Sequence, residues 1–147
     1  MEKKEFKKLF GDVAKSRGFH FIHGFWYIES EECIITLELQ KSNYSDLYYL
    51  NIETFVHGLF GEHYVKNKAL LRKVGTVSLR PPSKYKNFLD LEVITDLQES
   101  RQGFESLFDE YILPFASQGL SRKGILELPD AFKVGIPGIA KEALGLV

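Results

Sequence analysis

The stretch LELQKSNYSDLYYLNIETFVHG, residues 37–58, decides the fold of this chain. Apolar and polar residues alternate on both sides of the polar loop KSNYSD, residues 41–46, and the first run begins at Cys33. Alternation with period two is typical of a strand with one buried face, and Ser, Asn and Asp are typical of turns. The stretch therefore predicts an antiparallel hairpin that joins strands at 33–40 and 47–57.

The alternation also predicts which side chains of the hairpin face the core. If the two strands pair symmetrically about the loop, Leu37 lies opposite Leu50 on the core side. Thr36 then lies opposite Asn51 on the other side of the sheet. A shift of two residues keeps this sorting, whereas a shift of one residue would bury charged side chains.

Two segments have the spacing of amphipathic helices. Apolar residues recur at i, i+3, i+4 and i+7 within 6–13, which predicts a helix over about 2–17. A longer apolar face runs through 104–115, and Pro114, which lacks an amide donor, should kink or end that helix. The tail from 120 onward is interrupted by Gly and Pro, so it should hold short helical pieces and a last helix to about 144.

Three further segments are interpreted as strands: 19–28, which Gly24 bends or divides into two, 74–80, which Pro81-Pro82 closes, and 88–94. The order of helix, strands and helices predicts an α+β fold, in which an antiparallel sheet of about four to five strands packs against an N-terminal helix and C-terminal helices. With 147 residues, the chain is expected to form a single domain, 1–147.

The composition gives no electrostatic reason to expect nucleic acid or a membrane as a partner. Lys and Arg number 19 and Asp and Glu number 20, so the formal net charge is -1. The N-terminal segment MEKKEFKKLF lacks the apolar run of a signal peptide, and no apolar window reaches the length of a membrane span. We therefore expect a cytoplasmic protein.

The common motifs of catalysis and metal binding do not occur in the sequence. There is no phosphate-binding glycine loop, no GxSxG nucleophile motif and no HExxH helix. The single cysteine, Cys33, begins a strand on its core side and is interpreted as a buried, inert thiol. His20 and His23 point to opposite faces of a strand, so they do not share a metal. The sequence predicts no catalytic residue, no metal and no cofactor.

Six polar residues of the hairpin and of the following strand are candidates for binding a ligand: Gln40, Lys41, Ser42, Asn51, His57 and Arg80. Gln40 and His57 lie roughly 15 to 20 Å apart along the sheet at about 3.3 Å per residue. One small ligand cannot contact both, so either Gln40 acts with Asn51, or His57 acts with Arg80. A purely structural interpretation also exists, in which Gln40 and Ser42 satisfy backbone groups of the turn.

The same residues carry a resemblance to a known family. A helix ending in RGF, the aromatic strand FWYI and the hairpin resemble the bacterial DUF4304 family, which is marked by Gln-Lys-Ser near a strand end and Asn in the next strand. Here these are Gln40, Lys41, Ser42 and Asn51. The similarity continues through Arg80 and YILPF, over roughly residues 5 to 120. The family has no assigned activity, so the resemblance implies a fold and no mechanism.

Two hypotheses for the function follow. The preferred one is a non-enzymatic protein-binding or accessory module, with toxin neutralisation as one such role, whose partner is another protein or a second copy of the chain. The alternative is a small-ligand-binding protein or an enzyme, with a polar cleft near Gln40 and Asn51 or near His57 and Arg80. A cleft that brings those residues together favours the alternative, whereas an apolar patch favours the preferred hypothesis.

Overall fold

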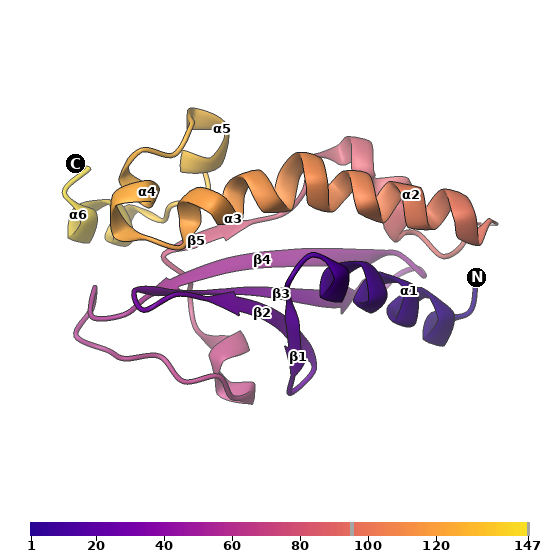
Figure 1. Cartoon of the computed structure of the whole chain (residues 1–147), viewed down its shortest axis with the longest axis horizontal. Coiled ribbons are helices and arrows are strands. Elements are labelled where there is room, and N and C mark those ends of the chain that lie inside the picture. Colours follow the sequence, from indigo (N-terminus) through magenta and orange to yellow (C-terminus); the bar gives the residue numbers. More distant parts are fainter. Residues whose placement is uncertain (95, 147) are drawn as a thin grey trace.

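The computed structural model describes residues 1–94 and 96–146. A five-stranded antiparallel sheet has its strands in the sequential order β1-β2-β3-β4-β5, and helices precede and follow it (Figure 1). The strands are β1 (His20–Ile22), β2 (Phe25–Glu29), β3 (Cys33–Lys41), β4 (Tyr48–Val56) and β5 (Val77–Leu79). The α-helices are α1 (Lys3–Ser16), α2 (Leu97–Leu107), α3 (Leu113–Gly119), α4 (Arg122–Leu126), α5 (Asp130–Lys133) and α6 (Gly138–Leu144). The predicted α+β class is confirmed, with its N-terminal helix, antiparallel sheet and C-terminal helices.

The main core lies between the helices and one face of the sheet. Phe6 and Phe10 of α1 pack against Phe104 of α2, with ring centroids 5.6 and 5.4 Å apart. All three side chains are fully buried, as are Leu37 and Ile52 on the facing strands. Burial of this aromatic and aliphatic surface is the main force that holds the helices on the sheet.

The opposite face of the sheet is partly covered by residues 58–73, which lie on the other side of the strands from α2 and α3 (Figure 1). Tyr64 and Leu70 pack there on Phe25, Ile34 and Phe55. Leu70 belongs to a short 3-10 helix, η1 (Lys68–Arg72). Phe55 is therefore core rather than part of an exposed aromatic patch.

The hairpin of β3 and β4 has the predicted faces but not the predicted register. Leu37 lies opposite Ile52, and Leu39 lies opposite Leu50, so the pairing is shifted by two residues. Lys41 continues β3, and the Ser42 amide donates to the Leu47 carbonyl oxygen at 2.8 Å, which moves the loop one residue along the chain. Because the shift is even, Leu37 and Leu50 still face the core.

The predicted strand at 88–94 is wrong. A 3-10 helix, η2 (Ser83–Leu89), covers its beginning, and only one isolated bridge, between Leu47 and Asp90, links the segment to the sheet. Leu89 and Leu91 are buried, but Val93 is 51 % exposed, so the three do not share a core face as a strand would require. The fifth strand comes instead from the division of 19–28 into β1 and β2.

The helical run of α2 and α3 does not end at Pro114, which is one of the two outcomes that the sequence predicts for this proline. A π-helical segment, η3 (Phe108–Ile112), joins the two α-helices. A π turn shifts the hydrogen-bond pattern by one residue, so the run accommodates a proline that has no amide to donate. The apolar face predicted for 104–115 is confirmed, and Phe104, Phe108 and Phe115 are fully buried.

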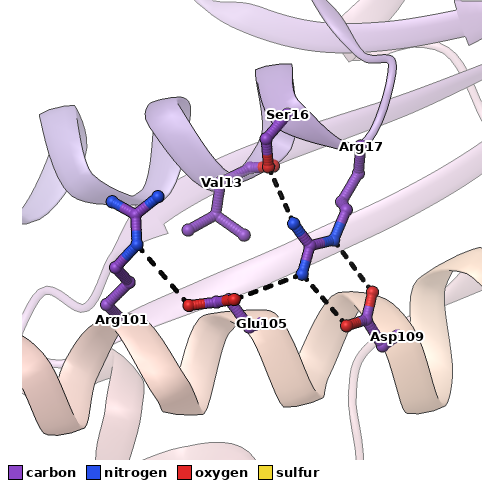
Figure 2. A network of polar contacts seen from close by, with 6 residues as sticks. All are labelled: Val13, Ser16, Arg17, Arg101, Glu105 and Asp109. Atoms are coloured by element: carbon purple, nitrogen blue, oxygen red, sulfur yellow. Dashed lines mark hydrogen bonds and ion pairs between the residues drawn. The ribbon is translucent and has the colours of Figure 1, made fainter.

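An arginine at the end of α1 ties this helix to α2 and η3 (Figure 2). The Arg17 guanidinium donates from Nε and Nη2 to both carboxylate oxygens of Asp109, at 2.9 and 3.0 Å, and from Nη2 to Glu105 at 3.4 Å. Its Nη1 donates to the Ser16 hydroxyl at 2.9 Å. These hydrogen bonds hold the pKa of the Asp109 carboxyl below its usual value. The bidentate pair fixes how α1 lies against α2.

Candidate functional site

Three of the six predicted site residues form one hydrogen-bonded network on the polar face of the sheet. The Asn51 amide nitrogen donates to Gln40 Oε1 at 2.8 Å and to Glu38 Oε1 at 3.2 Å. The Arg80 Nε donates to Asn51 Oδ1 at 2.9 Å. Asn51 lies on β4 between Gln40 on β3 and Arg80 just after β5, so its amide uses both ends to connect them.

Further contacts fix both the side chain and the backbone of Arg80. Its guanidinium lies over the Tyr49 ring, 4.4 Å from the centroid. Tyr111 of η3 donates its hydroxyl hydrogen to the Arg80 carbonyl oxygen at 3.3 Å. Pro81 and Pro82 follow directly and restrict the backbone, since the proline ring fixes φ. Arg80 is thus held in one place by sheet, helix and loop together.

Beside Arg80 the surface forms a recess of about 280 Å³. Its residues come from the start of β4 and from the loop and 3-10 helix after β5, and they include Tyr49, Arg80, Pro81, Ser83, Lys86 and Leu89. Most of the side chains that line the recess are apolar or aromatic, and its cationic groups belong to Arg80 and Lys86. The arrangement resembles a small-ligand site, which combines apolar walls with a few polar groups.

Two predicted residues serve the hairpin loop instead. The Ser42 hydroxyl accepts a hydrogen bond from the Tyr44 amide at 3.1 Å, and the side chain is buried. Lys41 Nζ donates to the carbonyl oxygens of Ser42 and Ser45 at 3.4 and 3.3 Å. The structural interpretation of Ser42, in which it satisfies the turn, matches these contacts.

His57 lies apart from the network. Its ring stacks on His63, with centroids 4.0 Å apart, and its Nδ1 accepts a hydrogen bond from the Tyr64 amide at 3.1 Å. Burial, and then the neighbouring His63, lower the pKa of His57. Six residues of strand separate Asn51 from His57, about 20 Å at 3.3 Å per residue. Of the two predicted pairs, the structure brings Gln40 together with Asn51, but it does not bring His57 together with Arg80.

Next to the network, Glu53 carries a half-buried carboxyl. Burial raises the pKa of Glu53 to about 7, although the Ser78 hydroxyl opposes the shift by donating to Oε1 at 2.8 Å. The carboxyl fits against the backbone because residue 75 is glycine: a Cβ atom there would lie 2.5 Å from Oε2. Sequence analysis did not single out Glu53, because an acid on an exposed strand face looks solvated.

We expect Glu53→Gln to stabilise the protein at pH 8 by about 1 to 2 kcal/mol and to change little at pH 4. A carboxyl whose pKa is raised on folding holds its proton more tightly in the folded state. Its contribution is therefore complete below its ordinary pKa of 4.5 and is lost as pH rises to about 7. Urea denaturation at the two pH values measures the difference. The exposed Glu92→Gln serves as control, and an equal effect of Glu53→Gln at both pH values would contradict the shifted pKa.

A concavity larger than the recess beside Arg80 lies elsewhere, between α1 and the β1–β2 hairpin. This α1–β1 groove has a volume of about 780 Å³, and its lining includes Lys7, Gly11, Lys15, Phe21, Trp26 and Leu39. Trp26 forms its floor and packs against Gly11, where a Cβ would lie 3.3 Å from the indole ring. Phe21 stacks edge-on against Trp26 at 4.9 Å and is 61 % exposed.

The rim of the α1–β1 groove is mainly cationic. Lys7, Gly11 and Lys15 recur every four residues, so they share one side of α1. The acid on this rim, Asp12, pairs with Lys8 at 2.9 Å. His20 of β1 also lines the groove. Sequence analysis missed this groove because lysines on a helix look like a solvated face until the helix is placed beside an aromatic hairpin.

Two classes of site find no support in the residues that the structure describes. Within 1–94 and 96–146, no group of three or more His, Cys, Asp or Glu side chains is placed to hold a metal ion. No helix in that part of the chain combines the length and the apolar composition needed to cross a bilayer.

The architecture is an α+β domain with a five-stranded antiparallel sheet, a linked Gln40–Asn51–Arg80 network and a separate groove. The family model described as "Domain of unknown function (DUF4304)" matches residues 10–118, so the chain belongs to the DUF4304 family. The resemblance expected from Gln40, Lys41, Ser42 and Asn51 is confirmed. No curated protein and no solved structure matches the chain.

Proposed function

We propose that this protein is a non-enzymatic binding module, of the accessory or toxin-neutralising kind, that acts in the bacterial cytoplasm. It holds an acidic segment of a partner protein in the α1–β1 groove. The observation that carries the proposal is the combination of the exposed Phe21 beside the Trp26 floor with a cationic rim in the α1–β1 groove. Aromatic anchors surrounded by charges of one sign are typical of surfaces that bind a partner of the opposite sign.

The backbone beside the groove adds to this argument. His23 and Gly24 both have positive φ, 49° and 89°, as in the two-residue turn that joins the closest hairpins. In such a hairpin Ile22 and Phe25 exchange hydrogen bonds. Phe21, the residue before Ile22, therefore directs its amide and carbonyl away from β2. Phe21 therefore offers a partner both an apolar side chain and a pair of backbone groups at the edge of the sheet.

The lysines on the rim of the groove support an acidic partner. Lys7 and Lys15 have no ion pair among the described residues, so their charges are available to a partner. An acidic segment would neutralise them and would also place its apolar side chain against Phe21 and Trp26.

Photo-crosslinking in cells that express the protein tests this proposal. With p-benzoylphenylalanine in place of Phe21, we expect a discrete crosslinked protein whose contact peptide, mapped by mass spectrometry, is acidic. The same analogue in place of Tyr44, which is 97 % exposed in the β3–β4 loop, should not form it.

Charge reversal supplies the matched control for the crosslink. Lys7→Glu combined with Lys15→Glu should reduce the crosslink by about tenfold, because each reversal adds a like-charge contact. Lys68→Glu combined with Lys123→Glu makes the same change in net charge outside the groove and should leave the crosslink intact. Equal crosslinking from positions 21 and 44, or an unchanged yield after reversal in the groove, would contradict the proposed surface.

A further inference from the structure

We infer that the recess beside Arg80 is a second, independent binding site, which holds the carboxylate of a small ligand with an apolar body. The recess lies between the start of β4 and the loop and 3-10 helix after β5, whereas the α1–β1 groove lies between α1 and the β1–β2 hairpin. The inference does not depend on the partner proposed for that groove.

The guanidinium of Arg80 is oriented so that its terminal nitrogens remain available. Asn51 accepts from Nε, and the group lies over the Tyr49 ring. Neither Nη1 nor Nη2 has a hydrogen-bond partner within the described residues. An arginine that is held at Nε presents its two terminal N–H groups side by side, which matches the two oxygens of a carboxylate.

Gln40 and Asn51 act as positioning residues in this site. Asn51 can accept from Arg80 because its nitrogen is already directed toward Gln40 and Glu38. Without these two acceptors the Asn51 amide could turn over and present its nitrogen to the guanidinium, which has no acceptor to offer it. Gln40 and Asn51, which are two of the four residues that carry the resemblance to the family, therefore fix the orientation of Arg80, although they do not line the recess.

The charges around the recess favour a monoanion. Arg80 and Lys86 bring two cations, and Ser83 adds a hydroxyl. Two carboxyls lie on the same sheet face: Glu38 accepts from Asn51, and Glu53 is held by Ser78. No carboxylate lies within ion-pair distance of Arg80 among the described residues. Burial raises the pKa of Glu53 to about 7, so below that pH its carboxyl is mainly protonated. About one positive charge is then unmatched, which suits a carboxylate better than a phosphate dianion.

The walls of the recess favour an apolar body of limited size. Apolar and aromatic residues, among them Tyr49, Pro81 and Leu89, supply most of the lining, and about 280 Å³ lies near the lower end of small-ligand sites. A ring or a branched chain of a few carbons fills such a volume. Long or strongly polar ligands would leave either the walls or their own polar groups without partners.

Titration of the ¹⁵N-labelled protein with benzoate, followed by NMR, tests this inference. We expect benzoate to bind with a Kd of about 1 mM or tighter, and to shift the Arg80 Nε–Hε signal and the amide signals of Ser83 and Lys86. Benzamide, which has the same shape without the charge, should bind at least about tenfold more weakly. Phenyl phosphate tests the alternative source of anionic oxygens.

Two variants test the charge of Arg80 and the orientation of its guanidinium separately. Arg80→Gln should weaken benzoate binding about ten- to a hundredfold, whereas Arg72→Gln makes the same change in net charge at an exposed position and should have no effect. Asn51→Ala should weaken binding and also broaden the Arg80 Nε–Hε signal before any ligand is added. Circular dichroism confirms that each variant is folded.

Four results would overturn the inference. Equal binding of benzamide would show that the recess does not recognise charge. Tighter binding of phenyl phosphate would assign the site to phosphate instead. Benzoate shifts that survive in Arg80→Gln, or the absence of any shift at 20-fold above about 1 mM, would remove Arg80 from any such role.

Discussion

Phe10→Ala should lower the free energy of unfolding by about 3 to 5 kcal/mol, the largest effect that we expect from a single truncation in this chain. Phe10 is fully buried at the centre of the core. Its ring contacts Trp26 at 5.0 Å, and Phe104 and Phe108 at 5.4 Å each. Truncation would remove these contacts and leave a cavity between α1, the sheet and the long helix.

Urea denaturation followed by the fluorescence of Trp26, the single tryptophan, measures this effect. Phe60→Ala is the matched control, because that phenylalanine is 43 % exposed in the loop after β4. It should cost no more than about 1 kcal/mol. If both substitutions cost the same, Phe10 would not be the centre of the core.

The sequence predicts well those parts of the fold that the spacing of apolar residues is sufficient to specify. The alternation through 33–57 identifies two strands and their faces, since a one-residue error would bury Glu38. Parity cannot distinguish registers that differ by two residues. The choice depends on tertiary contacts of the loop: Leu91 donates its amide to the Asp46 carbonyl oxygen, and Leu47 forms a bridge with Asp90.

The segment at 88–94 shows how alternation can mislead in a short run. Leu89 and Leu91 are buried as a strand would bury them, but the backbone turns after η2. The Val93 amide donates to the Asp90 carbonyl oxygen at 3.1 Å, a local contact that no strand makes. Over so few residues a turn and a strand can bury the same positions.

The two sites differ in how far the sequence predicts them. The alternation of the hairpin is sufficient to predict that Gln40 and Asn51 share a face of the sheet. The position of Arg80 opposite Asn51 depends on the pairing of β4 with β5 across a long connection, which no local pattern specifies. The α1–β1 groove depends on where α1 lies over the hairpin, and Arg17 fixes that position through contacts with residues about 90 positions away.

Leu50→Ala should lower the free energy of unfolding by about 2 to 5 kcal/mol. Leu50 is 1 % exposed and lies opposite Leu39 in the hairpin, on the face that packs beneath the helices. Gln40→Ala, on the opposite face of the same hairpin, removes one hydrogen bond at an exposed position and should cost about 1 kcal/mol or less. Urea denaturation of both variants compares the two faces. A larger loss from Gln40→Ala than from Leu50→Ala would mean that the faces are reversed, and the polar network around Arg80 would then lie inside the protein rather than on its surface.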